Sequence, residues 1–167
     1  MFCLSAVGEH PLLLLIGLPG SGKSTFAAQL TQQDQQYRLI STDRIREALF
    51  GSEATQGDWM RIWHEIQRQF KAAIAHSQPG SACIVIYDAT NARRRDRRKL
   101  ILLARHCGFT HITGVWFDTP LDVCLERNRK RDRQVPDEII LQMHRRLLGG
   151  PPDLSDGLDE LIIHRNQ

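Results

Sequence analysis

A glycine-rich stretch near the start of the chain has the residue types and spacing of a phosphate-binding loop. Residues 17–24 read Gly-Leu-Pro-Gly-Ser-Gly-Lys-Ser, which fits the pattern G-x-x-x-x-G-K-[ST]. Glycines let consecutive backbone N–H groups curl around a phosphate, and the following helix points its positive end at the same anion. In such loops the lysine pairs with the β- and γ-phosphates, and the last hydroxyl binds Mg²⁺. We therefore predict ATP and Mg²⁺ here, with Lys23 catalytic, Ser24 a metal ligand, and nucleotide contacts from Gly17, Pro19, Gly20, Ser21, Gly22, Lys23, Ser24 and Thr25.

A carboxylate and an arginine follow the second apolar segment. Asp43 would stand at the carboxyl end of the strand next to the one that precedes the glycine-rich loop, where it can accept a proton from an attacking hydroxyl. Arg46, three residues later, shares a helix face with Asp43 and can clamp a substrate phosphate. The alternative is that Asp43 only helps to cap the helix. Because the loop precedes them, we predict Asp43 as a general base and Arg46 as a substrate-binding residue.

The third apolar segment ends in Tyr87-Asp88-Ala89-Thr90-Asn91. Asp88 follows a run of apolar residues, so it can hold a Mg²⁺-bound water, or it can orient Asn91 or the substrate. Thr90 and Asn91 can also simply cap the next helix. We predict Asp88 as a metal and substrate ligand and Asn91 as a substrate ligand.

Positive charge is concentrated in two segments, although the formal net charge is only +3. One is residues 93–99, and the other is residues 127–133. Such concentration suggests a polyanionic ligand, whereas the alternative is a pair of solvated helix faces. Arg127 and Arg131 lie four residues apart, which would place them on one helix face. We predict both as catalytic lid arginines, which fold over ATP and stabilise the transferring phosphoryl group, with a lid at about residues 127–136.

Alternating strands and helices must position these residues. Apolar runs predict strands at residues 12–16, 37–40, 82–87, 112–117 and 160–164. Helical periodicity and end signals predict helices at residues 23–33, 42–50, 58–76 and 93–107, from residue 119 into the basic segment, and from residue 135 to 149. Thr119 is the expected N-cap of the fifth helix, with Pro120 in its first turn. This order predicts an α/β fold with parallel crossovers and ligands beyond the carboxyl ends of the strands.

Composition narrows the class of protein. With 167 residues, 41% hydrophobic and 25% charged, the chain has the size and composition of one globular domain. The longest apolar run is too short to cross a bilayer, and residues 1–10 hold no Lys or Arg, so we expect a cytoplasmic protein without a secretory signal or membrane contact. The four cysteines lack metal-ligand spacing and are expected to be buried hydrophobes. No D-x-x-G or N-K-x-D motif of a GTPase is present, and the chain is short for a motor ATPase.

The order and spacing of the motifs resemble those of P-loop kinases of the polynucleotide 5′-hydroxyl kinase type. The resemblance covers most of residues 12–148 and rests on GLPGSGKST at 17–25, D-x-x-R at 43–46, D-x-T-N at 88–91 and ERNRKR at 126–131. It implies a three-layer P-loop kinase domain with a mostly parallel sheet of about five strands and a helical lid, filling residues 1–167. It also implies that Lys23 and Ser24 engage ATP and Mg²⁺, that Asp43 is the base, and that Arg46 contacts a substrate phosphate.

The function expected from this resemblance is ATP-dependent phosphorylation of 5′-hydroxyl ends of DNA or RNA. The basic residues at 93–95 and in the lid would steer the polyanion. No phosphatase D-x-D-x-T motif is present, so repair of 3′ ends is not expected. Two alternatives remain: a kinase of a small-molecule hydroxyl such as a sugar, nucleoside or antibiotic, and a non-catalytic ATP-binding switch.

Overall fold

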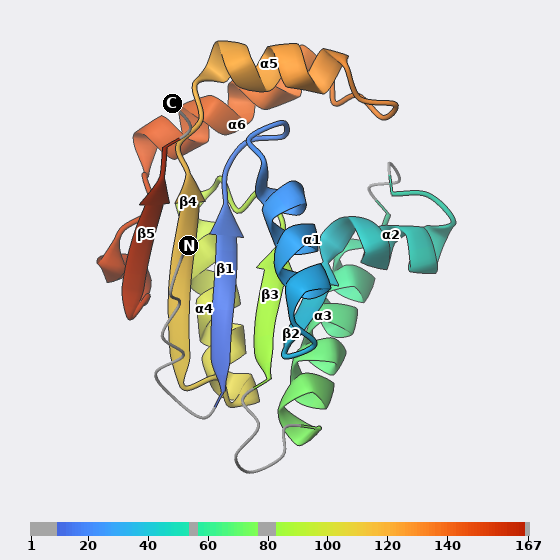
Figure 1. Ribbon diagram of the computed structural model, residues 1–167, viewed down its shortest axis with the longest axis vertical. Helices are drawn as coiled ribbons and strands as arrows, with labels where there is room; N and C mark the ends of the chain where they lie inside the picture. Colours follow the sequence, from blue (N-terminus) through green and yellow to red (C-terminus); the bar gives the residue numbers. More distant parts are fainter. Residues whose placement is uncertain (1–9, 54–56, 77–82, 166–167) are drawn as a thin grey trace.

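The computed structural model describes residues 10–53, 57–76 and 83–165, and it shows a single sheet with helices on both faces (Figure 1). All five strands are parallel, in the order β2-β3-β1-β4-β5. They are β1 (Pro11–Ile16), β2 (Tyr37–Ser41), β3 (Ile84–Asp88), β4 (His111–Phe117) and β5 (Glu160–His164). The predicted α/β fold is therefore confirmed. The prediction that the strand before Asp43 neighbours the strand before the glycine-rich loop is wrong, because β3 pairs with both β1 and β2 and lies between them. The predicted start of the third strand, Ala82, lies outside the described residues.

Strand β1 is central because it is apolar on both faces. Its six residues are all buried, and it pairs with β3 on one side and β4 on the other. Leu13 and Leu15 pack toward α1 (Lys23–Gln33) with Ala27, whereas Leu12 and Leu14 pack into the larger core on the opposite face. Because successive strand side chains point to opposite faces, a continuous apolar run is what a doubly covered strand requires.

Six α-helices in the described part of the chain surround this sheet. Helix α1 covers one face, and α3 (Trp59–Ala75) and α4 (Arg94–Cys107) lie behind the other (Figure 1). The remaining α-helices are α2 (Thr42–Phe50), α5 (Leu121–Arg129) and α6 (Asp137–Gly149), and a short 3₁₀ turn, η1, spans Leu154–Asp156. Helices α5 and α6 lie across the carboxyl ends of the strands, above the loop that joins β1 to α1 (Figure 1). The helix positions predicted from periodicity are thus confirmed to within a few residues.

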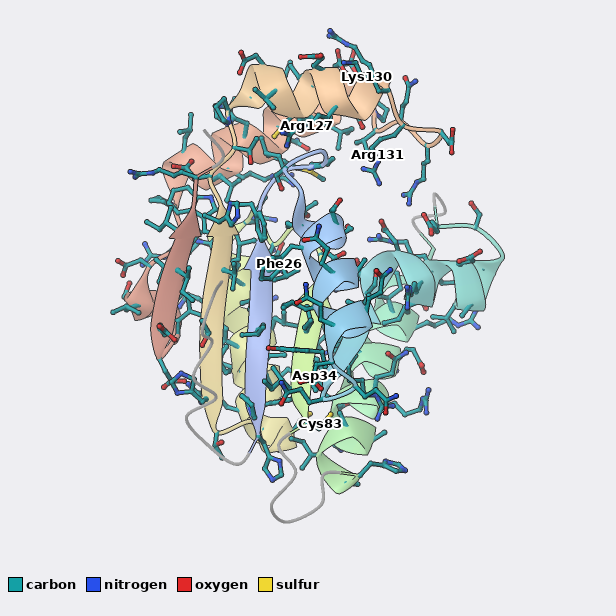
Figure 2. All side chains as sticks on the ribbon, viewed as in Figure 1. Phe26, Asp34, Cys83, Arg127, Lys130 and Arg131 are labelled. Atoms are coloured by element: carbon teal, nitrogen blue, oxygen red, sulfur yellow. The ribbon has the colours of Figure 1, made fainter. Side chains whose placement is uncertain are left out.

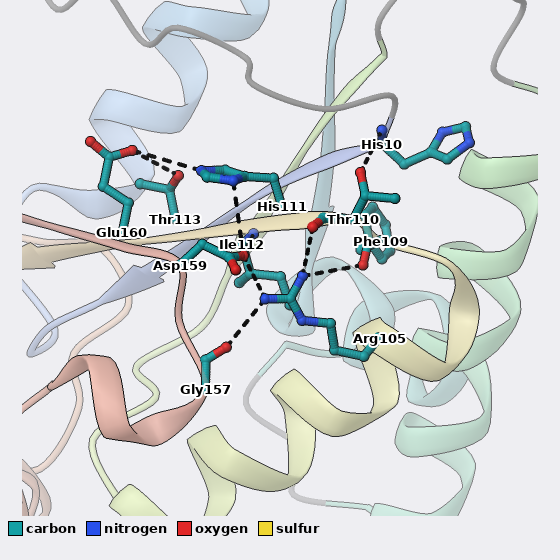
Figure 3. A network of polar contacts seen from close by, with 10 residues as sticks. All are labelled: His10, Arg105, Phe109, Thr110, His111, Ile112, Thr113, Gly157, Asp159 and Glu160. Carbon is teal, nitrogen blue, oxygen red and sulfur yellow. Dashed lines mark hydrogen bonds and ion pairs between the residues drawn. The ribbon is translucent and has the colours of Figure 1, made fainter.

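Two polar networks hold β5 and the segment before it against the rest of the fold. At the amino end of β4, the carboxylate of Asp159 accepts hydrogen bonds from Arg105 at the end of α4 and from the backbone N–H of Ile112 (Figure 3). Nδ1 of His111 lies 4.0 Å from Oδ2 of Asp159, and its Nε2 lies 3.9 Å from Oε2 of Glu160. These contacts lie at the end of the sheet opposite to the glycine-rich loop.

The second network surrounds Arg97 of α4, whose side chain is fully buried. Its Nε donates to Oδ2 of Asp156 at 2.9 Å, and its Nη2 donates to the carbonyl of Gly150 at 2.7 Å. Its Nη1 donates to the carbonyls of Asn91 and Ala92. Arg94 donates to the other oxygen of Asp156 at 2.8 Å. The guanidinium of Arg97 therefore connects the β3–α4 loop, the end of α6 and η1.

Among the residues that the structure describes, no helix combines the length and apolar character needed to cross a bilayer.

Candidate active site

The glycine-rich loop joins β1 to α1 at the carboxyl edge of the sheet, where its glycines are sterically required. Gly22 is the N-cap of α1 and has a φ of 103°. Gly20 has a φ of +80°, and a Cβ there would stand 2.5 Å from the carbonyl oxygen of Cys124 in α5. Such a contact is too close for any side chain, so the loop passes directly against α5. The start of α1 carries no side-chain cap, and this leaves its positive end facing the loop.

Hydrogen bonds from two neighbouring segments hold the loop. The N–H of Gly17 donates to the carbonyl of Thr90 at 3.1 Å. The hydroxyl of Thr119 donates to the carbonyl of Ser21 at 3.0 Å. The prediction that Thr119 caps α5 is therefore wrong: the N-cap is Pro120, without a side-chain cap. The buried hydroxyl of Thr119 is the hydrogen-bond donor to the Ser21 carbonyl rather than a helix cap. This bond fixes the loop to the segment after β4.

Lys23 is buried at the base of this loop, with 6% of its surface exposed. Its Nζ donates to the carbonyl of Leu18 at 2.8 Å and to Oγ of Ser21 at 3.3 Å. Burial lowers the pKa of Lys23 from 10.5 to about 8, the charges of Asp88 and Asp43 oppose this shift, and Arg131 adds to it. Three other predicted site residues thus lie near enough to act on the Lys23 ammonium group.

We expect nucleotide affinity to depend on the charge of Lys23. Because a bound phosphate stabilises the ammonium form, ATP affinity should be constant below about pH 8 and weaken as the pH rises through that value. The loss should approach about tenfold per pH unit while a proton must be taken up on binding. Titration of the protein with a fluorescent ATP analogue across this pH range measures the effect. Lys23→Met should bind more weakly and without this pH dependence, and an unchanged pH profile in Lys23→Met would contradict the assignment.

Asp43 lies in the first turn of α2, and its carboxylate is held by two arginines. Arg46 Nη1 donates to Oδ1 at 2.9 Å, and Arg133 Nη1 lies 3.3 Å from Oδ2. The side chain of Asp43 is still 44% exposed, so part of the carboxylate faces solvent. The N-cap of α2 is Ser41, so the described contacts of Asp43 are with guanidinium groups rather than with a capped backbone. A carboxylate that is fixed on two sides and open on another is suited to accept a proton from a bound hydroxyl.

Asp88 and Asn91 flank the glycine-rich loop on the β3 side. Asp88 is the last residue of β3, is buried, and lies in register with Ser41 of β2. Asn91 adopts a positive φ of 48°, and its Nδ2 donates to the carbonyl of Leu15 at 2.7 Å. The described hydrogen bonds of Asn91 therefore position the β3–α4 loop against β1. Its predicted contact with substrate stays a prediction.

The lid arginines come from α5 and from the loop after it. Helix α5 ends at Arg129, so Arg131 does not extend the helix face of Arg127 as the four-residue spacing predicted; the N–H of Arg131 closes a turn onto Asn128. Both side chains nevertheless lie on the side of the lid that faces the glycine-rich loop, whereas Lys130 points away (Figure 2). Lys130 pairs with Glu126 at 2.6 Å on the exposed side of α5. The turn after α5, rather than helical periodicity, brings Arg131 toward Lys23.

The basic segment 93–99 is only partly a surface for ligands. Arg97 is fully buried, and Arg94 is bound to Asp156 and Ser155. Arg93 and Arg95 are exposed. The sequence predicts one basic face here, but packing uses two of its arginines, Arg94 and Arg97, to hold Asp156. Arg133 is a further candidate residue that the sequence did not single out, because no local pattern shows that it reaches Asp43.

The loop and its neighbours fit a nucleotide with Mg²⁺. The buried Lys23 ammonium donates hydrogen bonds to two uncharged oxygens, those of Leu18 and Ser21. Because a buried charge is stabilised by an opposite charge, a phosphate bound in the loop would be a favourable partner. Ser24 is exposed in the first turn of α1, and Asp88 closes the adjacent strand. Mg²⁺ characteristically takes one or two protein oxygens and completes its shell with water and phosphate. The hydroxyl of Ser24 and the carboxylate of Asp88 are consistent with this coordination.

The sequence and the fold both match known proteins. Residues 12–149 match the model of a family described as an AAA domain, AAA_33. The curated L-seryl-tRNA(Sec) kinase of Methanococcus maripaludis is 28% identical over 137 residues, which are 80% of this chain and 51% of that protein. The chain thus spans about half the length of this relative.

Solved structures share the fold at lower identity. A chain in the structure of the Pnkp1/Rnl/Hen1 RNA repair complex has a TM-score of 0.73 at 22% identity, covering 89% of this chain and 47% of that one. The Deinococcus radiodurans tunicamycin resistance protein has a TM-score of 0.61 at 19% identity, covering 92% of this chain and 86% of that one. At these identities the likeness shows the fold alone.

Proposed function

The chain belongs to the AAA_33 family of AAA domains and is a P-loop NTPase domain of the kinase type; on this premise we propose that it transfers the γ-phosphate of ATP to a 5′-hydroxyl end of DNA or RNA. The hydroxyl oxygen forms a bond to the γ-phosphorus, its proton passes to the carboxylate of Asp43, and ADP leaves. Mg²⁺, held by Ser24 and Asp88, would neutralise charge on the phosphates. Lys23, Arg127 and Arg131 stabilise the transferring group.

The observation that carries this proposal is the carboxylate–arginine pair at the start of α2. Asp43 and Arg46 are joined at 2.9 Å, and the charge of Asp43 acts on the Lys23 ammonium, so base and phosphate-binding loop share one site. A polynucleotide acceptor carries a phosphate one nucleotide away from its 5′-hydroxyl. A guanidinium fixed beside the base is suited to bind that phosphate while the hydroxyl approaches Asp43.

The experiment is transfer of γ-labelled phosphate to oligonucleotides. Purified protein with Mg²⁺ and labelled ATP should label RNA or DNA that ends in a 5′-hydroxyl, and it should not label the same strand with a 5′-phosphate. The 5′-phosphorylated strand is the matched control, since it differs only at the acceptor group. Bound ATP without transfer to either nucleic acid would reject the polynucleotide as acceptor.

Salt dependence provides a second measurement on the same reaction. If the acceptor is a single strand bound through its phosphates, the logarithm of kcat/KM should fall with the logarithm of salt concentration, with a slope of about −0.7 for each phosphate neutralised. The exposed Arg93 and Arg95 and the lid arginines are the residues that would supply this charge. A flat response to salt would contradict a polyanionic acceptor.

A seryl hydroxyl carried by a tRNA is the second candidate acceptor. It is favoured by the 28% identity with the L-seryl-tRNA(Sec) kinase, and the chemistry at Asp43 would be the same. The two candidates differ in where the label goes: onto a terminal ribose, or onto the amino acid that mild base releases from the tRNA. Assaying serine-charged tRNA beside the oligonucleotides therefore separates them. Transfer to a free sugar, nucleoside or antibiotic in the same assay would instead identify a small-molecule kinase.

A further inference from the structure

Arg133 connects the lid to the acceptor side of the site. Its Nη1 donates to Oε2 of Glu53 at 2.8 Å, and its Nη2 donates to the carbonyl oxygen of Glu53 at 2.9 Å. Glu53 lies just beyond the C-terminus of α2, 80 residues away in the chain. A planar guanidinium that makes two hydrogen bonds to one residue has a fixed orientation. The side chain is therefore anchored to the segment that directly follows the helix carrying Asp43.

The same guanidinium also reaches the general base. Nη1 of Arg133 lies 3.3 Å from Oδ2 of Asp43, while Arg46 holds Oδ1 at 2.9 Å. Arg46 comes from α2 itself, so it is present whatever the lid does. Arg133 belongs to the lid, so its contact with Asp43 exists only when the lid lies over α2. The orientation of the carboxylate is therefore complete only in this closed arrangement.

We propose that Arg133 is a positioning residue that, anchored by Glu53, latches the lid to α2 and orients Asp43 for proton abstraction. The role of Asp43 as base rests on the proposed function, whereas the latch rests on the contacts of Arg133 alone. Closure over ATP would then complete the acceptor site as well, which ties activation of the hydroxyl to the presence of nucleotide. Open to solvent on its remaining side, Asp43 is still accessible to the acceptor.

The latch is tested by amide hydrogen exchange of the lid, in residues 127–136, with a non-hydrolysable ATP analogue. Arg133→Ala and Glu53→Gln should exchange faster there than the wild-type protein. Arg129→Ala is the matched control, because it removes a lid arginine that pairs with Asp137 at 2.7 Å rather than with α2. It should keep most of the protection. Equal exchange in the wild-type protein and in Arg133→Ala overturns the proposal, whatever the acceptor is.

Positioning is tested by a double-mutant comparison of phosphoryl transfer. Arg133→Ala should lower kcat roughly tenfold, the effect of losing one hydrogen bond between charged groups, with nucleotide affinity changed less than about twofold. Arg133→Lys should retain an intermediate rate. An ammonium keeps the charge but lacks the planar fork with which Nη1 contacts both carboxylates while Nη2 holds the carbonyl of Glu53. In an Asp43→Asn background, Arg133→Ala should add little. An equal factor in both backgrounds would show a merely structural role and overturn the positioning function.

The two tests separate this inference from the proposed function. If the wild-type protein labels no 5′-hydroxyl strand while Arg133→Ala still loosens the lid, the polynucleotide function fails and the latch stands. If strands are labelled equally well by both proteins, the proposed function stands and the positioning role fails.

Discussion

Asp43→Asn is expected to abolish most phosphoryl transfer while leaving ATP binding intact. The substitution keeps the size of the side chain but removes the group that accepts the hydroxyl proton, and general bases contribute roughly 10²- to 10⁴-fold to such rates. Steady-state kinetics with a saturating acceptor should show this loss in kcat. Titration with an ATP analogue should show a dissociation constant within about twofold of wild type, since binding arises mainly from the glycine-rich loop and Lys23.

Glu47→Gln is the matched control for Asp43. It removes a carboxylate from the same helix, one turn later, at an exposed position. It should retain nearly full activity. A large loss in Glu47→Gln would mean that the net charge of α2 matters rather than the base, and retained transfer in Asp43→Asn would refute general-base catalysis by Asp43. If Asp43→Asn bound ATP normally and no acceptor were found for either protein, the non-catalytic switch would be favoured.

Of the substitutions proposed for this protein, Asp156→Ala is expected to lower the free energy of unfolding most. Asp156 is buried and accepts from Arg94 and Arg97, and burial lowers the pKa of the Arg97 guanidinium while Asp156 opposes that shift. Removing one partner of a buried ion pair leaves an uncompensated charge, which costs about 3–5 kcal/mol in the free energy of unfolding. Urea denaturation measures this as a lower midpoint with an unchanged slope.

Two further variants assign the cause. Asp156→Asn keeps a hydrogen-bond acceptor without the charge and should lose less stability. Asp153→Ala removes an exposed carboxylate from the same turn, where it caps η1 by accepting from the N–H of Ser155, and should lose much less stability than Asp156→Ala. If Asp156→Ala were no more destabilising than Asp153→Ala, the buried pair would not contribute as the contacts indicate.

The elements of this fold and the choice of most candidate site residues follow from local patterns. The five strands appear as apolar runs because the sheet is covered on both faces, and α3 shows its buried face every four residues, at Ile62, Ile66 and Phe70. The glycines and Lys23 are recognisable because a loop that wraps a phosphate needs those residue types at fixed spacing. Asp43 and Asp88 follow from the rule that parallel strands present their carboxyl ends at one edge.

The partners of the arginines were decided by tertiary structure. In the chain, residues 93–99 and 127–133 look alike, as runs of basic residues. Packing buries Arg97 against Asp156, leaves Arg93 exposed, turns Arg131 toward Lys23 and places Arg133 between Glu53 and Asp43.

The physical reason for this division is the range of the interactions. Helix and strand periodicity and loop geometry depend on neighbours a few residues apart, so the sequence by itself determined them. An ion pair depends on which distant segments meet: Arg97 and Asp156 are 59 residues apart, and Arg133 and Glu53 are 80 apart. The phosphate-binding loop, the candidate base and the parallel α/β class were therefore readable from the chain. The order of the strands, the buried guanidinium and the contact of Arg133 exist only once the sheet, α2 and the lid have come together.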